Sequence, residues 1–389
     1  MSQRRVALVH DYLNQNGGAE RVVEALHDLY PEAPVYTSIY APELMPALYR
    51  DWDIRTSFMQ HLPGIHRHHQ PYLPLYPFAF NRFRLNGYDL VLSSSSAWGK
   101  GVKVGPGTLH ICYCHAPMRF AWDFSGYAER ERLGGWQRRA LTPMLGWLRQ
   151  WDRRTAAGVD AFIANSGIIA ERIKRYWGRD ATVINPPVDL TGLRPAAPDE
   201  IEDYFLVLSR LVPYKRIDVV VAAFTALGLP LKVAGDGRAR AELERIAGPN
   251  VRFLGPVSDE EKAWLLARCQ AAIFPGEDDF GIAQVEVQAS GRPAIALARG
   301  GSLDTVVDGV TGILFEPRSI EGVVEAVRRF QRTAFSVDAI INNARRFSRE
   351  RFEGEIRAFV DERMARHWES VGRQQPLLPN EAEAPAPWS

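Results

Sequence analysis

Short, mainly apolar segments alternate with amphipathic ones along most of this chain, and this alternation restricts the possible folds more than any other feature. In the first half the apolar segments cover residues 6–9, 35–39, 89–93, 109–114 and 159–164. In the second half they cover residues 205–208, 231–234, 251–254, 271–274, 294–297 and 312–315. Apolar strands separated by helices are typical of a parallel sheet that is covered on both faces. The sequence therefore predicts two doubly wound α/β units.

Residues between these segments have helical periodicity. Within residues 18–29, for example, Val22, Val23, Leu26 and Leu29 recur at the spacing of one helix face. Further helices are predicted at residues 135–156 and 167–177 and, near the end, at 344–367. Doubly wound sheets bind ligands at the carboxyl ends of their strands, so two such units facing each other would hold a ligand between them.

The alternation is interrupted once, at Pro186-Pro187 and the following residues 189–203. We therefore predict an N-terminal domain at 1–188, a linker at 189–203 and a C-terminal domain at 204–370. The length of 389 residues fits two domains of about 100–200 residues each. Residues 374–389, rich in Pro, Ala and Glu, are predicted to be a disordered tail.

Charge and cysteine content narrow the possible partners and location. Three cysteines are too few to hold a chain of this size together by disulfides, so we expect a cytoplasmic protein. No apolar run has the length of a signal-peptide core or of a membrane-spanning helix. Residues 1–190 carry 22 Lys and Arg against 17 Asp and Glu, a net +5, and residues 191–389 carry 25 against 29, a net −4. A mildly basic first half suits an anionic lipid surface and is far too weak for a nucleic-acid partner.

An acidic loop followed by a helix forms the most informative motif. The predicted strand ends at Phe274, and the loop after it carries Asp278. Phe280-Gly281 then opens a helix that carries Glu286 in its second turn. The free N–H groups at a helix start can hold a phosphate or a sugar hydroxyl. The alternative is an acidic first turn that complements the helix dipole and has no ligand.

Two cations follow the first strand of the second half. Arg210 and Lys215 lie where that strand ends and a helix begins. Such a pair can clamp a diphosphate, Arg as a planar fork and Lys as a point charge, or can be two solvated surface cations. The next strand ends in Gly235-Asp236-Gly237, which is either a turn or a contact on the nucleotide side.

The first half contributes a glycine pair and a histidine. Gly17-Gly18 begins a helix after the first strand, where the backbone could approach a ligand and supply anion-binding N–H groups. The pair does not match the Gly-x-Gly-x-x-Gly pattern of dinucleotide sites. His115 follows another strand and precedes Pro117, so it is either a packed core histidine or a group at the ligand-binding edge.

Three other features suggest metal or membrane sites. The spacing Cys112-x-Cys114-His115 has no second Cys/His pair to complete a zinc site, and alternate residues on a strand face opposite ways. Asp51-x-Asp53 matches an Asp-x-Asp metal motif, but we see no strand before it. The histidines at 61, 66, 68 and 69 are irregularly spaced among prolines. We therefore predict no metal.

The basic, aromatic helix at 135–156 either lies on a membrane surface or packs on its sheet.

Together these motifs resemble family 4 of the retaining glycosyltransferases, in the branch that makes bacterial surface polysaccharides and includes mannosyltransferases. The resemblance extends to about residue 370 and implies the GT-B fold, with two Rossmann-like domains facing across a cleft. It implies no metal and no cofactor beyond the nucleotide sugar. The first acid of the family pattern is usually Glu, whereas the register here falls on Asp278, so the sugar contact would be remade through water or by Glu277.

Site residues follow from the resemblance position by position. His115 and Asp278 would contact the donor sugar, and Arg210 and Lys215 would bind the diphosphate. The remaining donor-binding positions implied are Gly17, Gly18, Asp236, Phe280, Gly281, Ile282 and Glu286, the last for the ribose hydroxyls.

The predicted function is transfer of a hexose, with mannose from GDP-mannose preferred, to a lipid-linked or polysaccharide acceptor. A UDP-sugar donor is the alternative. Three other classes stay open: a phosphorylase or epimerase, a non-catalytic sugar-binding protein and an NAD-dependent oxidoreductase. Peripheral attachment to the inner face of the cytoplasmic membrane is compatible with the basic first half.

Overall fold

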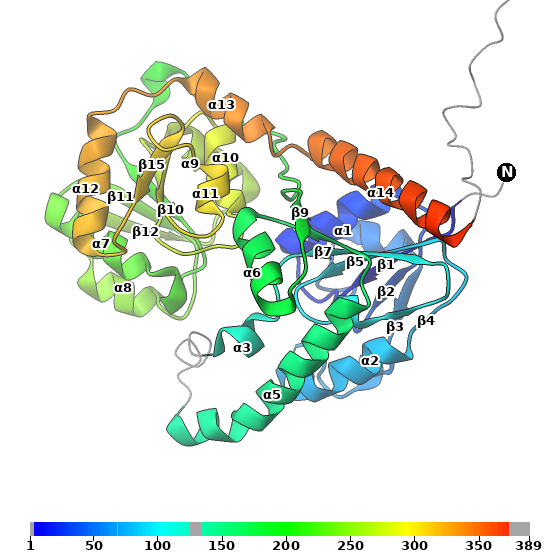
Figure 1. The fold of residues 1–389 in the computed structure, drawn as a ribbon. Coiled ribbons are helices and arrows are strands. Elements are labelled where there is room, and N and C mark those ends of the chain that lie inside the picture. Colours follow the sequence, from blue (N-terminus) through cyan, green and yellow to red (C-terminus); the bar gives the residue numbers. More distant parts are fainter. Residues whose placement is uncertain (1–3, 68, 125–133, 373–389) are drawn as a thin grey trace, which may run out of the picture.

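The chain forms two parallel sheets, each covered by helices on both faces (Figure 1). The computed structural model describes residues 4–67, 69–124 and 134–372. The predicted tail at 374–389 and His68 lie outside the described residues. The two-unit α/β fold predicted from the alternation is confirmed.

The first sheet has seven strands in the order β3-β2-β1-β5-β7-β8-β9, and all its neighbours are parallel. Its strands are Val6–His10 (β1), Val35–Thr37 (β2), Ile54–Thr56 (β3), Leu90–Ser95 (β5), Leu109–Cys114 (β7), Ala161–Ala164 (β8) and Ala181–Val183 (β9). A small separate pair joins Arg84–Leu85 (β4) to Lys103–Val104 (β6).

The second sheet has six strands in the order β12-β11-β10-β13-β14-β15, again all parallel. Its strands are Phe205–Leu208 (β10), Leu231–Ala234 (β11), Val251–Gly255 (β12), Ala272–Phe274 (β13), Ala294–Leu297 (β14) and Gly312–Phe315 (β15). The strand order reverses between β10 and β13, and ligands of open α/β sheets bind at such a point.

Helices connect the strands of both sheets. In the first half they are Gly18–Leu29 (α1), Tyr76–Arg82 (α2), Arg119–Trp122 (α3), Gly135–Ala157 (α5) and Gly167–Trp177 (α6). In the second half they are Ile217–Leu227 (α7), Arg240–Ile246 (α8), Asp259–Arg268 (α9), Ile282–Ala289 (α10), Ser302–Thr305 (α11), Ile320–Gln331 (α12), Val337–Arg345 (α13) and Arg349–Val371 (α14). Short 3₁₀ turns include Pro213–Lys215, directly before α7.

Two edge strands, β3 and β9, are absent from the sequence prediction. Their side chains are mostly half-buried or exposed, so neither strand has the apolar run that identifies the central strands. The prediction that no strand leads into Asp51-x-Asp53 is confirmed, since the 3₁₀ turn Ala47–Asp51 runs into this motif and β3 follows it.

The end of the chain differs from the prediction. Two helices, α13 and α14, stand in place of one, and α14 begins where Ser348 accepts a hydrogen bond from the Arg351 N–H at 3.3 Å. Helix α14 returns to the first sheet, where Phe352, Ile356 and Trp368 join its apolar core. The range 204–370 predicted for the C-terminal domain therefore includes a helix that packs on the N-terminal sheet (Figure 1).

Helix α5 packs on the sheet through its second half. Leu145 and Leu148 are fully buried in the core that also contains Trp98, as expected of an ordinary covering helix. Trp147, on the same helix, is exposed and stacks on Phe78 of α2, with ring centroids 6.4 Å apart. No helix among the described residues has the length and apolarity needed to cross a lipid bilayer.

A buried histidine makes the fold sensitive to acid. His110 lies within β7, is fully buried and contacts the Ser93 hydroxyl at 2.9 Å through its Nε2. Burial, with a smaller contribution from the charge of Lys100, lowers the pKa of His110 to about 4. In the unfolded chain this histidine has an ordinary pKa near 6.5, so between about pH 6.5 and pH 4 it binds a proton there but not in the folded chain. The free energy of unfolding therefore falls as the pH drops below about 6.5.

From pH 7 to pH 5 this histidine should lower the free energy of unfolding by about 2 kcal/mol. Urea unfolding of the wild type and of His110→Gln at both pH values measures the effect. The variant should lose about 2 kcal/mol less than the wild type over this interval. An equal loss in both proteins would show that His110 is not responsible.

Candidate active site

The two cations predicted after β10 lie beside the predicted acid. The Lys215 ammonium donates a hydrogen bond to the Asp278 carboxylate, although 63 positions separate the two residues. Arg210, Lys215 and Asp278 line one cavity of about 120 Å³, together with Phe274 at the end of β13 and Ala283 in α10. Residues predicted from two distant motifs are therefore neighbours at the switch point of the second sheet.

The loop between β13 and α10 is anchored from within. The Phe280 side chain is buried and packs edge-on against Phe347, with centroids 5.4 Å apart. Gly281 has a φ of +98°, a left-handed conformation that favours glycine, and it caps α10. Within the described part of the chain, the backbone N–H groups of Phe280, Gly281 and Ile282 have no hydrogen-bond partner. They are available for the phosphate or sugar oxygens that the sequence predicts.

Glu286 has a partner that the sequence did not indicate. Its carboxylate lies 3.1 Å from the Lys262 ammonium of α9. Burial lowers the pKa of Lys262, but the charges and hydrogen bonds of Glu286 and Asp259 together outweigh it, so the pKa is raised and the lysine stays charged. Glu286 is not among the residues that line the cavity, but it lies one helical turn beyond Ala283, which is.

The loop after β11 packs closely against the segment that carries Arg210. A Cβ on Gly235 or Gly237 would collide with the backbone oxygens of Ser209 and Leu211, so only glycine permits this approach. The Asp236 carbonyl accepts the Leu211 N–H at 2.9 Å. The Asp236 carboxylate itself is exposed, accepts the Gly237 N–H at 2.7 Å and lies outside the lining of the cavity.

The glycine pair of the first half lies at the start of α1. The Gly17 N–H, predicted to bind an anion, donates to the Glu20 carboxylate at 2.8 Å in this structure. Gly18 instead touches the second half, because a Cβ there would lie 2.7 Å from Cδ1 of Ile282. The start of α1 and the start of α10 therefore meet across the boundary between the two halves.

His115 lies at the end of β7 in a buried chain of polar groups. Its Nε2 is 2.7 Å from the Ser94 hydroxyl, which in turn is 3.1 Å from Nδ1 of His10. Nε2 of His10 is 3.4 Å from the Glu20 carboxylate. Burial, then the neighbouring His10, lowers the pKa of His115 to about 3. A neutral imidazole can hydrogen-bond a sugar hydroxyl, but it does not act as a general acid at neutral pH.

Ion pairs join the two halves next to Asp278. Arg119 and Arg172, from the first half, both bind the Asp279 carboxylate, Arg172 at 2.8 Å. Arg172 also binds Glu277 at 2.9 Å. Glu277 is thus held by an arginine of the first half. The acids on either side of Asp278 bind the first half, which leaves Asp278 on the Lys215 side of the loop.

The cysteines of β7 are buried. Cys112 and Cys114 are both inaccessible, and burial raises the pKa of each thiol, that of Cys112 to about 12. No three His, Cys, Asp or Glu side chains gather into a metal-ligand set within the described ranges.

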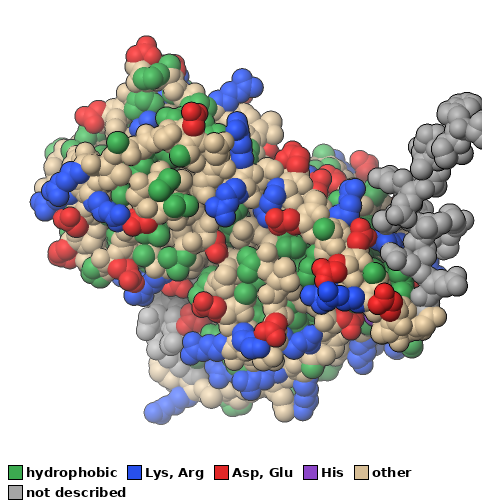
Figure 2. Space-filling model, turned by 45° about the horizontal axis from the view of Figure 1, so that its top comes forward, with side chains coloured by type: hydrophobic (Ala, Val, Ile, Leu, Met, Phe, Trp, Pro, Cys, Tyr) green, Lys and Arg blue, Asp and Glu red, His purple; other side chains and the backbone are tan. Residues whose placement is uncertain are grey.

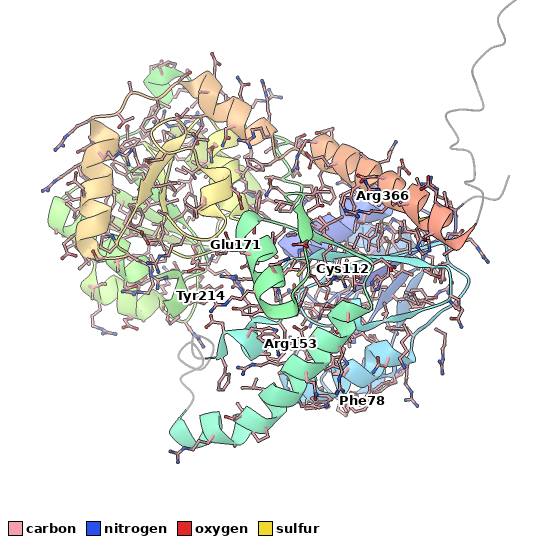
Figure 3. All side chains as sticks on the ribbon, in the orientation of Figure 1. Phe78, Cys112, Arg153, Glu171, Tyr214 and Arg366 are labelled. Atoms are coloured by element: carbon pink, nitrogen blue, oxygen red, sulfur yellow. The ribbon has the colours of Figure 1, made fainter. Side chains whose placement is uncertain are left out.

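A larger cavity of about 620 Å³ lies between the halves. Figure 3 places Tyr214, one of its lining residues, between the second sheet and helices α3 and α6. The lining comprises Pro117, Arg119, Trp122, Asp123, Arg172, Arg175, Tyr176, Pro213, Tyr214, Arg216, Glu277 and Arg318.

Comparisons with known proteins match both halves. Residues 16–191 match the model of Glycosyltransferase Family 4, and residues 194–347 match that of Glycosyl transferases group 1. A D-inositol 3-phosphate glycosyltransferase of Nocardioides sp. is 27% identical over 46% of this chain and 47% of its own length. A GDP-mannose-dependent alpha-mannosyltransferase of Mycolicibacterium smegmatis is 29% identical over 53% of this chain and 56% of its own length.

Among solved structures, Anabaena Alr3699/HepE in complex with UDP and glucose superposes with a TM-score of 0.67. It is 18% identical, and the match covers 92% of this chain and all of the Anabaena chain, which shows a shared fold. The curated relatives, by contrast, are matched over about half of their length. The family models on both halves and the shared two-sheet fold place the chain in family 4 of the GT-B glycosyltransferases.

Proposed function

We propose that this protein is a retaining glycosyltransferase that moves a hexose from a nucleotide diphosphate donor to a sugar or lipid-linked acceptor. The observation that carries the proposal is the convergence of Arg210, Lys215 and Asp278 on one cavity beside the free N–H groups at the start of α10. Two cations suit a diphosphate, a carboxylate suits sugar hydroxyls, and a helix start favours a negative charge.

The chemistry follows from this arrangement. As the bond between sugar and diphosphate breaks, negative charge grows on the leaving phosphate, where Arg210 and Lys215 would stabilise it. We assign the deprotonation of the acceptor hydroxyl to this phosphate, with attack on the same face of the sugar. His115, neutral because of its burial, would orient the donor sugar by a hydrogen bond. The protein would contribute positioning and electrostatics, with no metal.

GDP-mannose is the preferred donor in this proposal. It is supported by the similarity to the Mycolicibacterium smegmatis GDP-mannose-dependent alpha-mannosyltransferase. A UDP-sugar is the second candidate, because the Anabaena protein of the same fold was solved with UDP and glucose. Calorimetric titration with a panel of GDP- and UDP-sugars separates the two, and mass spectrometry of lipid-linked products identifies the sugar transferred.

Glu286→Gln should weaken donor binding. A hydrogen bond to a charged group contributes about 1.5–3 kcal/mol, so the donor Kd should rise about tenfold or more. Glu260→Gln, an exposed acid in the first turn of α9, is the matched control and should leave the Kd unchanged. A Kd for Glu286→Gln within twofold of the wild type would remove Glu286 from the donor site.

Other enzyme classes on the same fold predict different products. A phosphorylase would turn over a sugar substrate with phosphate, and an epimerase would convert the nucleotide sugar by itself. Neither reaction needs an acceptor. Incubation of donor with and without acceptor, followed by mass spectrometry, distinguishes these reactions from transfer.

The proposal includes attachment to an acidic lipid surface through the face formed by α2 and α5. Phe78 is 56% exposed and Trp147 is 39% exposed, and the two rings stack. Figure 2 shows Lys and Arg side chains gathered along the lower edge of the molecule, and Arg82 and Arg154 on these helices are exposed. Aromatic rings beside basic residues suit the headgroup region of a bilayer.

The double variant Phe78→Ser/Trp147→Ser should therefore sediment several-fold less with vesicles containing phosphatidylglycerol. The double variant Leu303→Ser/Val310→Ser removes exposed apolar side chains elsewhere and should sediment like the wild type. Equal sedimentation of all three proteins would count against this face.

A further inference from the structure

The larger cavity between the halves shares its walls with the proposed donor site. Tyr214 and Glu277 line the larger cavity, and their chain neighbours Lys215 and Asp278 line the smaller one. The volume of about 620 Å³ is in the range of small-molecule sites. A molecule held here would lie beside the sugar that the proposed function places at Asp278.

Positive charge dominates this cavity. Its walls carry five arginines against two carboxylates, with arginines contributed by both halves. Three of the five are paired: Arg119 and Arg172 with Asp279, and Arg216 with Asp218 at 3.0 Å. Arg175 and Arg318 form no ion pair with any carboxylate among the described residues.

The position of these two arginines matters. Arg175 comes from α6 of the first half, and Arg318 follows β15 of the second half, so the two approach the cavity from opposite sides. Like charges around one hollow raise its potential and attract an anion. Arginine is suited to phosphate and carboxylate because its planar fork binds two oxygens at once.

A fixed aromatic wall lies between the charges. The rings of Trp122 and Tyr176 are stacked, with centroids 4.7 Å apart and planes 9° from parallel. The Trp122 indole N–H donates to Asp152 at 2.7 Å, which holds the ring in place. The Arg153 guanidinium lies 4.8 Å from the Trp122 ring centroid, so the stacked pair is an aromatic wall flanked by positive charge.

We propose that the larger cavity is the acceptor site and that the acceptor carries an anionic group, a phosphate or a carboxylate, bound by Arg175 and Arg318. This inference rests on the proposed glycosyl transfer, and it adds the chemical class of the acceptor. The shared chemistry has two sources, the diphosphate of a lipid-linked sugar and the carboxylate of an acidic sugar.

Three acceptors with the same terminal sugar residue distinguish these sources: a decyl diphosphate-linked sugar, a neutral decyl glycoside and a decyl glycoside that contains a uronic acid. For Arg175→Gln and for Arg318→Gln, the ratio of kcat/KM for the anionic acceptor to that for the neutral one should fall about tenfold. If the ratio falls for the diphosphate-linked acceptor, the anion is the diphosphate of a lipid-linked sugar. If it falls for the uronic acid glycoside, the anion is a sugar carboxylate. Lys174→Gln is the matched control, since Lys174 neighbours Arg175, pairs with Asp180 at 2.7 Å and does not line the cavity. Unchanged ratios in both variants would overturn the proposal.

A binding experiment separates this inference from the proposed function. Titration of decyl diphosphate into protein saturated with nucleoside diphosphate should give a Kd that rises at least about tenfold in the Arg175→Gln/Arg318→Gln variant. The Kd of the nucleotide should not change. If the protein binds decyl diphosphate in this way but transfers no sugar from any donor, the anion site is supported and the proposed function is contradicted. Failure of the wild type to bind the anion, an equal Kd in the variant, or weaker nucleotide binding in the variant would each overturn the inference.

Discussion

Replacing Lys215 with alanine is expected to lower kcat for sugar transfer by about two to three orders of magnitude. Removing one preorganised group that stabilises charge in a transition state typically costs this much. The Lys215 ammonium lies in the same cavity as Arg210 and bonds the Asp278 carboxylate. Its loss would leave the leaving diphosphate with one cation fewer and would free Asp278 from its partner.

Radiolabelled donor measures the transfer. Lys215→Arg keeps the positive charge and should retain more activity than Lys215→Ala. The side chains of Lys215 and Asp278 are 18% and 28% exposed, so the pair contributes only about 1 kcal/mol to stability and the variants should fold. A kcat for Lys215→Ala within a few-fold of the wild type, with the fold intact, would contradict the proposed role.

The variant Asp152→Ala is expected to lose about 3–5 kcal/mol of unfolding free energy, because it leaves a buried ammonium without its counter-charge. Lys100 and Asp152 form an ion pair in which both side chains are at most 1% exposed. The Asp152 carboxylate also accepts the indole N–H groups of Trp122 at 2.7 Å and Trp177 at 2.6 Å. One small substitution therefore leaves Lys100 with only the Ala97 carbonyl, at 2.9 Å, as a hydrogen-bond acceptor, and it removes the acceptor of two indole N–H groups.

Urea unfolding followed by circular dichroism measures the loss. The double variant Lys100→Met/Asp152→Leu removes both charges together, and it should be more stable than Asp152→Ala because an apolar pair of similar volume has no uncompensated charge to bury. If the double variant is no more stable than the single one, the unpaired charge is not the cause. A loss below about 1 kcal/mol for Asp152→Ala would show that this pair is solvated.

Much of the fold could be predicted from local patterns. The limits of α1, α6 and β7 agree with those predicted from periodicity, because buried faces impose their spacing on consecutive residues. The edge strands β3 and β9 were missed because a half-exposed strand needs no such pattern. The last helix was predicted from its sequence, but its place on the first sheet was not.

The sequence likewise predicted some residues of the candidate site and missed others. Motifs at the ends of strands indicated Arg210, Lys215, Asp278 and Glu286, since the carboxyl ends of parallel strands share one edge. The partner of Glu286, Lys262, stands in an unremarkable helix with no motif around it. The buried chain of polar groups from Glu20 through His10 and Ser94 to His115 joins three separate segments.

By itself, the sequence determined the two α/β units, their element order and the chemical groups at the ends of their strands, because each of these depends on neighbours within a turn or two along the chain. Only the tertiary structure decided which charges meet. Arg119 reaches Asp279 across 160 positions, the Gly17 N–H is taken by Glu20, and α14 returns to the first sheet. Such pairings depend on how distant surfaces pack, and that packing leaves no periodic trace in the residues it joins.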